Sequence, residues 1–161
     1  MNTLNQKNWV TGAGRKVSLS FILNTIIPQI SKGRNIFIGS DSFVSQKKIC
    51  FVTTVCILRE NHGGRYFFYK ENTPTRKYNN LSSRITEEVR RSIELAEFFA
   101  SKGSCNPRLI ELHLDVSPRG TNNASSKFSD MLKGYVQGYG FPCKLKPNAW
   151  ASQTVADRHS K

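Results

Sequence analysis

The stretch NIFIGSDS, residues 35–42, is a short apolar run that ends abruptly in small and acidic residues. Its apolar side chains alternate between the two sides of an extended chain, which predicts a central strand buried on both faces. The carboxylate of Asp41 then lies at the edge of the sheet, where open α/β folds bind their ligands. A second stretch of this kind, LIELHLDV at residues 109–116, carries an aspartate near its end, Asp115. The repetition favours functional carboxylates over turn residues, the usual role of an Asp after a strand.

Length and charge indicate one domain with a polyanionic partner. A chain of 161 residues is expected to form a single domain, residues 1–161, with a sizeable core. Its 24 Lys and Arg residues outnumber 11 Asp and Glu residues, and the net charge is +13. Such an excess favours nucleic acid as the partner, with an anionic membrane surface as the second candidate. We predict nucleic acid of undefined type, no membrane partner and no small-molecule cofactor.

Hydropathy and cysteine usage indicate a cytoplasmic protein. No run of about eighteen apolar residues occurs, and the N-terminus MNTLNQKNWV lacks the apolar region of a signal peptide. The cysteines form no CxxC pair, and we predict that all of them are reduced thiols: Cys50, Cys56, Cys105 and Cys143. With three histidines in the chain, we expect no structural zinc site.

Periodicity divides the chain into alternating helices and strands. Helices are predicted at residues 17–30 and 81–102, from 125 or 126 to about 139, and from 148 or 149 onward. Strands are predicted at residues 35–40, 48–58, 65–69, 109–116 and 141–146, with a hairpin turn at 60–64 and a polar loop at 72–80. Residues 1–34 form an N-terminal extension, polar to about residue 16 and helical after it.

The order of these elements predicts an α/β fold. It consists of a five-stranded mixed sheet flanked by helices, with an extra N-terminal helix. Three strands in a meander, followed by strands connected through helices, form the topology of the ribonuclease H superfamily. We therefore predict a single ribonuclease H-like domain.

Acidic residues fall on four separate elements that this topology brings together. They are Asp41, Glu88, Asp115 and Asp157. Carboxylates that converge on one edge repel each other, and such a cluster is stable only with protons or divalent cations bound. Hard oxygen ligands select Mg²⁺ or Mn²⁺ over zinc. The four carboxylates are therefore candidate metal ligands and catalytic residues.

Glu88 is chosen over its neighbour Glu87 because of its position on the second long helix. Glu88 lies at the edge of the inward-facing stripe, whereas Glu87 is expected to point to solvent with Arg91 and Glu94. An inward glutamate costs free energy unless a partner compensates it. A glutamate at the rim of the helix, paired with a neighbouring arginine, is the alternative, and both interpretations remain open at this point.

The sequence also resembles the YkuK-type ribonuclease H-like family over nearly its whole length. The matching motifs are WVTGAGRKVSL (residues 9–19), FIGSDS (37–42), ITEEV (85–89) with the later ELAE (94–97), HLDVSP (113–118), GYVQGYGF (134–141) and KPNAWASQTVADRHSK (146–161). The resemblance implies a ribonuclease H-like fold and the same four candidate ligands.

The implied reaction is hydrolysis of phosphodiester bonds in RNA, DNA or a hybrid with two Mg²⁺ or Mn²⁺ ions. Asp41 would bridge both ions, Glu88 and Asp115 would complete one site, and Asp157 would complete the other. One ion would activate water and the other would stabilise the leaving oxygen.

Basic and aromatic side chains near the same edge are candidates for substrate contact. Five are predicted phosphate contacts, each individually unspecific: Arg119, Lys127, Lys144, Lys146 and Arg158. His113 is expected to be packed or hydrogen-bonded, and Trp150 is expected to be a core residue. His159 is expected to be a solvated tail residue, with proton transfer as the alternative.

Three classes of function remain open from the sequence. The first is a metal-dependent nuclease, the second a non-catalytic nucleic-acid-binding module, and the third an interaction protein that reuses the fold. The four carboxylates favour the first, because a non-catalytic binder of polyanions has no reason to gather negative charge. The positive net charge suits the first two classes and counts against the third.

Overall fold

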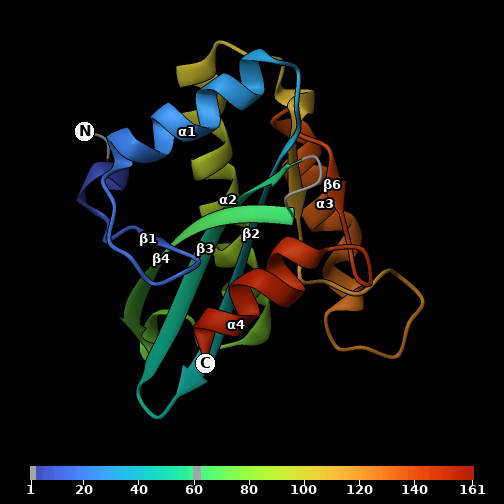
Figure 1. Ribbon diagram of the computed structural model, residues 1–161. Helices are drawn as coiled ribbons and strands as arrows, with labels where there is room; N and C mark the ends of the chain where they lie inside the picture. Colours follow the sequence, from blue (N-terminus) through green and yellow to red (C-terminus); the bar gives the residue numbers. More distant parts are fainter. Residues whose placement is uncertain (1–2, 60–62) are drawn as a thin grey trace.

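The computed structural model describes residues 3–59 and 63–161 and shows a six-stranded mixed sheet with helices on both faces (Figure 1). The strands follow the spatial order β1-β4-β3-β2-β5-β6. They are β1 Val10–Thr11, β2 Ile36–Ser45, β3 Lys48–Arg59, β4 Gly63–Pro74, β5 Ile110–His113 and β6 Cys143–Lys144. β2, β3 and β4 form an antiparallel meander, and β5 and β6 extend it as parallel strands. This is the predicted order of a meander followed by helix-connected strands.

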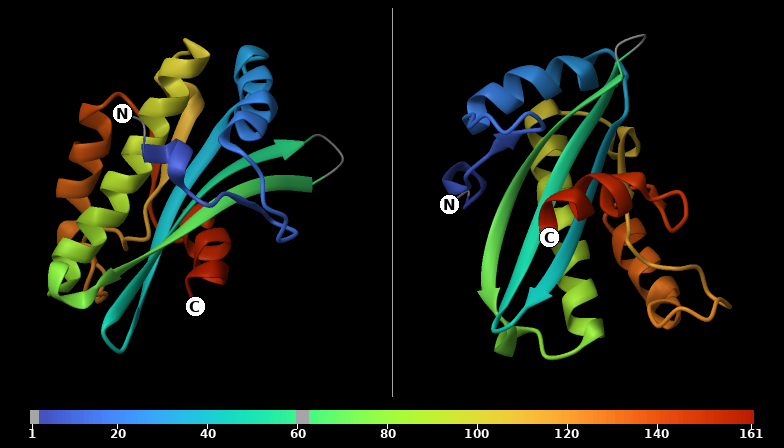
Figure 2. Two further views of the ribbon diagram at one scale, coloured as in Figure 1. Left: turned by 90° about the vertical axis from the view of Figure 1, so that its left-hand side faces the viewer. Right: turned by 60° about the horizontal axis from the view of Figure 1, so that its bottom comes forward.

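Helices cover the two faces of the sheet unequally. In the described ranges the α-helices are α1 Leu19–Ser31, α2 Leu81–Gly103, α3 Ser129–Gly138 and α4 Asp157–Ser160. Figure 2 shows α1, α2 and α3 on one side, here called the α2 face, and α4 alone on the other, the α4 face. A π-helical turn, Ala151–Ala156, leads directly into α4. The larger apolar core lies on the α2 face.

β2 is the central strand that its apolar pattern predicts. It lies between β3 and β5. Ile36 and Ile38 are fully buried in the core of the α2 face, while Gly39 lies on the α4 face against the backbone of the π-helical turn. β2 is longer than the predicted strand at residues 35–40, because its hairpin with β3 continues in register to Ser45.

The sheet has six strands, whereas the sequence predicted five, because the N-terminal segment adds β1. Val10 and Thr11 pair with Phe68 and Phe67 of β4. Trp9, just before β1, is buried in the main core. A two-residue strand in a polar segment is too short to produce a detectable alternation of apolar side chains. The segment predicted to be polar therefore supplies both a strand and part of the core.

Several other bounds also differ from the predicted ones. β4 continues to Pro74, through part of the predicted loop at residues 72–80, because β3 pairs with it along its whole length. Residues 60–62 of the predicted hairpin turn lie outside the described residues, although the two flanking strands are antiparallel as expected. β5 and β6 are shorter than predicted, but backbone hydrogen bonds between their segments extend to the pair Lys146 and Val116.

The first and second helices lie close to their predicted ranges, and α3 begins later than expected. Ser125 does not cap α3, because its hydroxyl accepts a hydrogen bond from the backbone N–H of Ser117 at 3.1 Å. That contact stabilises the loop before the helix. A single 3-10 turn, Ser126–Phe128, then precedes α3.

The cysteines and the hydropathy of the helices agree with the sequence analysis. All four cysteines are free thiols. Burial raises the pKa of Cys56 to about 12, so that thiol stays protonated at neutral pH. No helix in the described ranges combines the length and apolar character that a membrane crossing demands.

Gly39→Ala is expected to destabilise the fold. A Cβ atom at this position would lie 2.6 Å from the backbone N of Ser152 and 2.7 Å from the carbonyl carbon of Ala151. Because backbone atoms cannot move aside as the end of a side chain can, the expected loss is about 1–3 kcal/mol of unfolding free energy. Thermal unfolding would show it as a fall in Tm of several degrees.

Gly134→Ala is the matched control, since a Cβ atom there meets no atom within 4 Å. Alanine is favoured over glycine inside a helix by roughly 0.5–1 kcal/mol, so the Tm of this variant should stay level or rise. A Gly39→Ala protein that melts with the wild type would show that the π-helical turn does not rest on β2.

Candidate functional site

Asp41 and Asp115 occupy equivalent positions on two neighbouring parallel segments. Gly39 of β2 pairs with His113, the last residue of β5, and each aspartate lies two residues further along its chain. Asp41 thus lies inside β2, not at its end as predicted, because the β2–β3 hairpin continues beyond it. The parallel pairing nevertheless stops at this level. It leaves the two carboxyl groups close enough to share a hydrogen bond.

Glu88 approaches the same place from the α2 face. Ser42 Oγ donates a hydrogen bond to Glu88 Oε1, and one helical turn further on Ser92 Oγ lies 2.9 Å from Ser40 Oγ. Two strand residues span about 6.6 Å and four helix residues span about 6 Å, so both contacts form when the segments run in opposite directions. Glu88 is buried, as its position on the inward stripe predicts.

Burial and crowding change the pKa of two of these carboxyl groups. Burial first, and then the charge of Asp115, raise the pKa of Asp41 to about 7, against an opposing hydrogen bond from Ser160. Burial also raises the pKa of Glu88 well above its usual range, and the charges of Asp41 and Asp115 add to the effect. The three carboxyl groups therefore form one electrostatic site that retains a proton near neutral pH.

Asp157 lies at the margin of this site, on α4. Its charge raises the pKa of Asp41 less than that of Asp115 does, and its carboxylate pairs with Lys161 Nζ at 3.1 Å. The closer contact from α4 comes from Ser160, whose hydroxyl donates to Asp41 Oδ2 at 2.9 Å. The structure therefore brings Asp41, Glu88 and Asp115 together and leaves Asp157 beside them.

His113 determines where the C-terminal segment crosses the sheet. Its Nδ1 accepts a hydrogen bond from the backbone N of Ala151 at 3.0 Å, so its Nε2 carries the hydrogen and donates to Glu111 at 2.8 Å. Burial lowers the pKa of His113, which keeps the ring neutral. Trp150 packs edge-on against it with ring centroids 5.0 Å apart. His113 is packed and hydrogen-bonded, as the sequence predicted, whereas Trp150 is only partly buried and belongs to neither apolar core cluster.

His159 is not the solvated tail residue that the sequence predicted. Its Nε2 lies 2.8 Å from the hydroxyl of Tyr66, and its ring stacks on Phe68 with centroids 3.9 Å apart. Burial lowers the pKa of His159. Both aromatic partners lie on β4, far away in sequence, so no local signal could connect them. His159 fastens α4 to the sheet.

The sequence predicted that Glu87 points to solvent, and this is wrong: its side chain is only 8 % exposed. It pairs with Arg90 Nε at 2.8 Å and with Arg91 Nε at 2.9 Å. Arg91 is buried too, because its other partner is Glu71 on β4, at 2.6 Å. Burial alone would raise the pKa of Glu87, but the two arginines outweigh it and hold that pKa below its usual range. Glu87 thus belongs to a structural network of ion pairs.

Two of the five predicted phosphate contacts are engaged by acidic side chains. Lys146 Nζ lies 2.9 Å from Asp115 Oδ1, so it neutralises one member of the carboxylate site. Arg119 pairs with Asp130 at 2.9 Å, with both side chains largely exposed.

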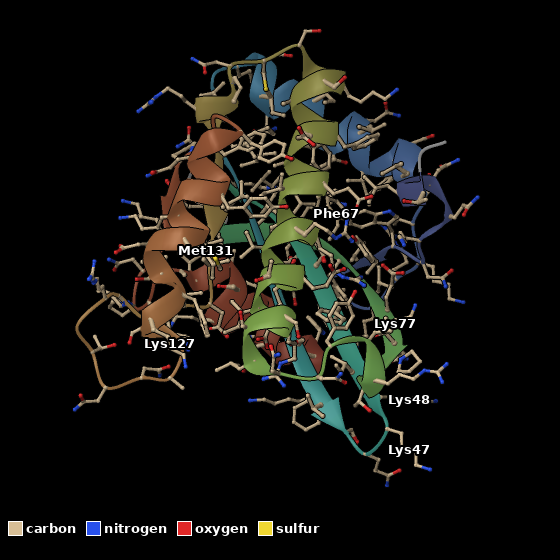
Figure 3. The ribbon with its side chains drawn as sticks, turned by 180° about the vertical axis from the view of Figure 1, so that it is seen from behind. Lys47, Lys48, Phe67, Lys77, Lys127 and Met131 are labelled. Atoms are coloured by element: carbon tan, nitrogen blue, oxygen red, sulfur yellow. The ribbon has the colours of Figure 1, made fainter. Side chains whose placement is uncertain are left out.

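The other three predicted contacts are exposed. Lys127 lies in the 3-10 turn before α3, with its ammonium 5.1 Å from the ring centroid of Phe128 (Figure 3). Lys144 is level with His113 in the pairing of β6 with β5. Arg158 lies on α4 between Asp157 and His159.

The chemistry of the cluster suits a hard divalent cation, although the arrangement is that of a proton-bearing site. In the part of the chain that the structure describes, no group of three or more His, Cys, Asp or Glu side chains is placed so that it could hold a metal ion. The carboxylate oxygens are instead engaged by Ser42, Ser160 and Lys146. All the donors are hard oxygens, which Mg²⁺ and Mn²⁺ prefer. The donor set therefore fits such a cation once these partners turn away.

The hydroxyl groups that hold these carboxylates were not predicted from the sequence. Ser42 follows Asp41 on a strand and so points to the opposite face, toward α2, a consequence of the two-residue period that could have been used. Ser160 had no such signal, because its contact with Asp41 spans 119 positions.

A meander extended by parallel strands, with acidic residues just beyond the parallel pair, defines the ribonuclease H-like class of α/β proteins. A family model described as Ribonuclease H-like matches residues 19–161. The chain therefore belongs to the ribonuclease H-like family, as its motifs indicate. No curated protein and no solved structure shows significant similarity to it.

Proposed function

We propose that the protein is a divalent-metal-dependent nuclease that hydrolyses phosphodiester bonds of RNA, DNA or an RNA/DNA hybrid. The proposal rests on the convergence of Asp41, Glu88 and Asp115 at the end of the parallel strand pair. Burying carboxyl groups side by side costs free energy, and a fold under no functional demand would place apolar side chains there. Family membership supports the same conclusion.

The candidate metal ligands are Asp41, Glu88, Asp115 and, from α4, Asp157. When bound, Mg²⁺ or Mn²⁺ would supply an activated water and charge stabilisation at the leaving oxygen, and we propose two ions. Ser42 and Ser160 orient the carboxylates of Glu88 and Asp41. Lys146 compensates the charge of Asp115 and would be freed for a substrate phosphate when a cation replaces it.

Nucleic acid is the partner that the charge of the surface favours. The chain carries a net charge of +13, and Lys127, Lys144 and Arg158 are exposed. Such a surface attracts a polyanion through release of the counterions around its phosphates. The free thiols suit a reducing compartment, and we propose the cytoplasm.

The ion pair between Lys146 and Asp115 favours a second candidate function. A lysine within 2.9 Å of a carboxylate compensates its charge without a cation. A site stabilised in this way could persist in a non-catalytic nucleic-acid-binding module. The difference between the two candidates is turnover, which a single assay measures.

The test uses labelled single-stranded DNA, duplex DNA, RNA, an RNA/DNA hybrid and branched DNA. Each is incubated with the purified protein in Mg²⁺, in Mn²⁺ or in EDTA. We expect cleavage of at least one substrate with either cation and none with EDTA. Binding of these substrates without cleavage would contradict the nuclease and support the binding module. If the protein neither binds nor cleaves any of these substrates, both candidate functions are excluded.

A further inference from the structure

The tip of the β2–β3 hairpin carries a groove next to the carboxylate site. Its volume is about 900 Å³, within the ~300–1,000 Å³ range of ligand clefts. It is lined mainly by Phe43, Lys47, Lys48, Cys50 and Asn72; we call it the hairpin groove. Figure 3 shows Lys47 and Lys48 at the free end of the hairpin. None of these residues takes part in the carboxylate site.

The register of the strands places the groove one step beyond Asp41 on the same face. Asp41 pairs with Val52, and Val52 pairs with Lys70. The next row on that face is Phe43, Cys50 and Asn72, since side chains two residues apart share a face. α4 reaches as far as the row of Asp41, through Ser160. The groove thus begins where α4 ends. An extended ligand bound in the groove would lead directly to the carboxylates.

The charge of the groove is positive and uncompensated. Lys47 and Lys48 line the groove, and Lys70 lies beside it in the row of Asp41. All three are exposed, and none of them forms an ion pair within the described residues. Glu71, next to Lys70, points to the other face, where it pairs with Arg91 and Lys7. Three ammonium groups with no acidic partner suit the phosphates of a polyanion.

Phe43 provides an aromatic face among these lysines. Its side chain is 40 % exposed, so the ring is accessible to a ligand in the groove. Aromatic rings interleaved with basic side chains bind single strands, because each unpaired base offers a free π-face for stacking. The bases of a duplex already stack on each other and offer no such face.

We propose that the hairpin groove binds a single-stranded nucleic-acid segment, with one base stacked on Phe43 and phosphates at Lys47, Lys48 and Lys70. The groove lies beside Asp41, so it would deliver a single strand, or the unpaired end of a longer substrate, to the carboxylate site. The inference rests on the proposed function for this role, but the binding itself does not depend on cleavage.

Fluorescence anisotropy in EDTA tests the binding alone. The probe is a fluorescein-labelled single-stranded oligothymidylate of about 12 nucleotides, compared with a duplex of the same length. We expect Phe43→Leu to weaken single-strand binding by roughly 5- to 150-fold, the range for loss of one stacked base. Phe43→Trp should retain affinity, and its added tryptophan fluorescence should be quenched by the probe.

The lysines are tested with a matched pair of double variants. Lys47→Gln with Lys48→Gln should weaken binding and lower the slope of log affinity against log salt by about 1.4, at ~0.7 for each lost contact. Lys32→Gln with Lys102→Gln removes the same charge from exposed positions at the ends of α1 and α2. This control should bind close to wild type, since Lys32 precedes the start of β2 and the groove follows its end.

Several results would overturn the inference. One is a wild-type protein that fails to bind the single strand. Another is a Phe43→Leu variant that binds it as tightly as wild type. A third is an equal loss of affinity in the two double lysine variants. Tighter binding of the duplex that is insensitive to Phe43 would do the same. Binding is measured in EDTA, where metal-dependent cleavage cannot occur, so the two proposals can fail separately. A wild-type protein that binds through Phe43 but cleaves no substrate with Mg²⁺ or Mn²⁺ would contradict the nuclease proposal and support the single-strand site.

Discussion

Asp41→Asn is expected to lower metal-dependent cleavage by at least about a hundredfold while the protein stays folded. The carboxylate of Asp41 lies beside that of Asp115, and the charges of Asp115 and Asp157 both raise its pKa. A cation held there stabilises several kcal/mol of charge in the transition state, which converts to a factor of a hundred or more in rate. Asparagine has the same shape and still accepts the hydrogen bond from Ser160. Single-turnover cleavage and a melting curve measure the two properties separately.

Glu87→Gln is the control for the loss of a buried carboxylate. Glu87 is 8 % exposed and Asp41 is 6 % exposed, so the two side chains are equally buried. Glu87 pairs with Arg90 and Arg91, and Glu88 occupies the carboxylate site in its place. We expect Glu87→Gln to lower the Tm, because Arg91 loses a buried partner, and to leave cleavage per folded molecule unchanged. Equal damage to cleavage from both variants, or a tenth of wild-type activity in Asp41→Asn, would remove Asp41 from its central role.

The frame of the fold could be predicted because burial follows local periodicity. Ile36 and Ile38 alternate with Phe37 and Gly39, and the central position of β2 follows from that pattern alone. The same logic places Asp41 and Asp115 two residues beyond a paired row. A helical stripe likewise turns Glu88 inward. In each case the residues that form the pattern lie close together in the sequence, within one strand or one helix.

The remainder could not be predicted because the deciding partner lies far away in the chain. Glu87 and Arg91 look like solvent-exposed charges until Glu71, on β4, is placed beneath α2. His159 looks like a tail residue until Tyr66 reaches it across 93 positions. Such pairs depend on which strand lies under which helix, and the local periodicity of apolar side chains does not show that packing.

The pH dependence of stability tests the raised pKa of Asp41. The pKa of Asp41 is about 7 in the folded protein and ~3.9 in an unfolded chain. Between these values the folded state binds more protons, so the contribution of Asp41 to stability is complete at low pH and is lost as the pH rises. The two pKa values correspond to a loss of about 4 kcal/mol by pH 8.

Asp41→Asn removes this contribution, because asparagine does not titrate, and it also removes the part of the rise in the pKa of Glu88 that the charge of Asp41 causes. The groups with lowered pKa values titrate in both proteins and cancel in the comparison: Glu71, Glu87, His113 and His159. In EDTA the variant should melt with the wild type near pH 4 and higher by on the order of ten degrees near pH 8. Equal melting temperatures at pH 8 would show that Asp41 is not crowded.

Divalent cations are expected to remove the same penalty in the wild type. At pH 8 the metal-free site holds uncompensated carboxylates, and Mg²⁺ or Mn²⁺ binds them in the folded state but not when the unfolded chain disperses them. The gain in unfolding free energy is RT ln(1 + [M]/Kd), where [M] is the concentration of free cation. At a hundredfold excess over Kd it is about 2.7 kcal/mol, or several degrees in Tm. Glu87→Gln should show the same rise, whereas Asp41→Asn should show little. If millimolar Mg²⁺ and Mn²⁺ leave the wild-type curve unmoved at pH 8, Lys146 and a retained proton are sufficient to hold the cluster. The non-catalytic nucleic-acid-binding module would then be the better account of this protein.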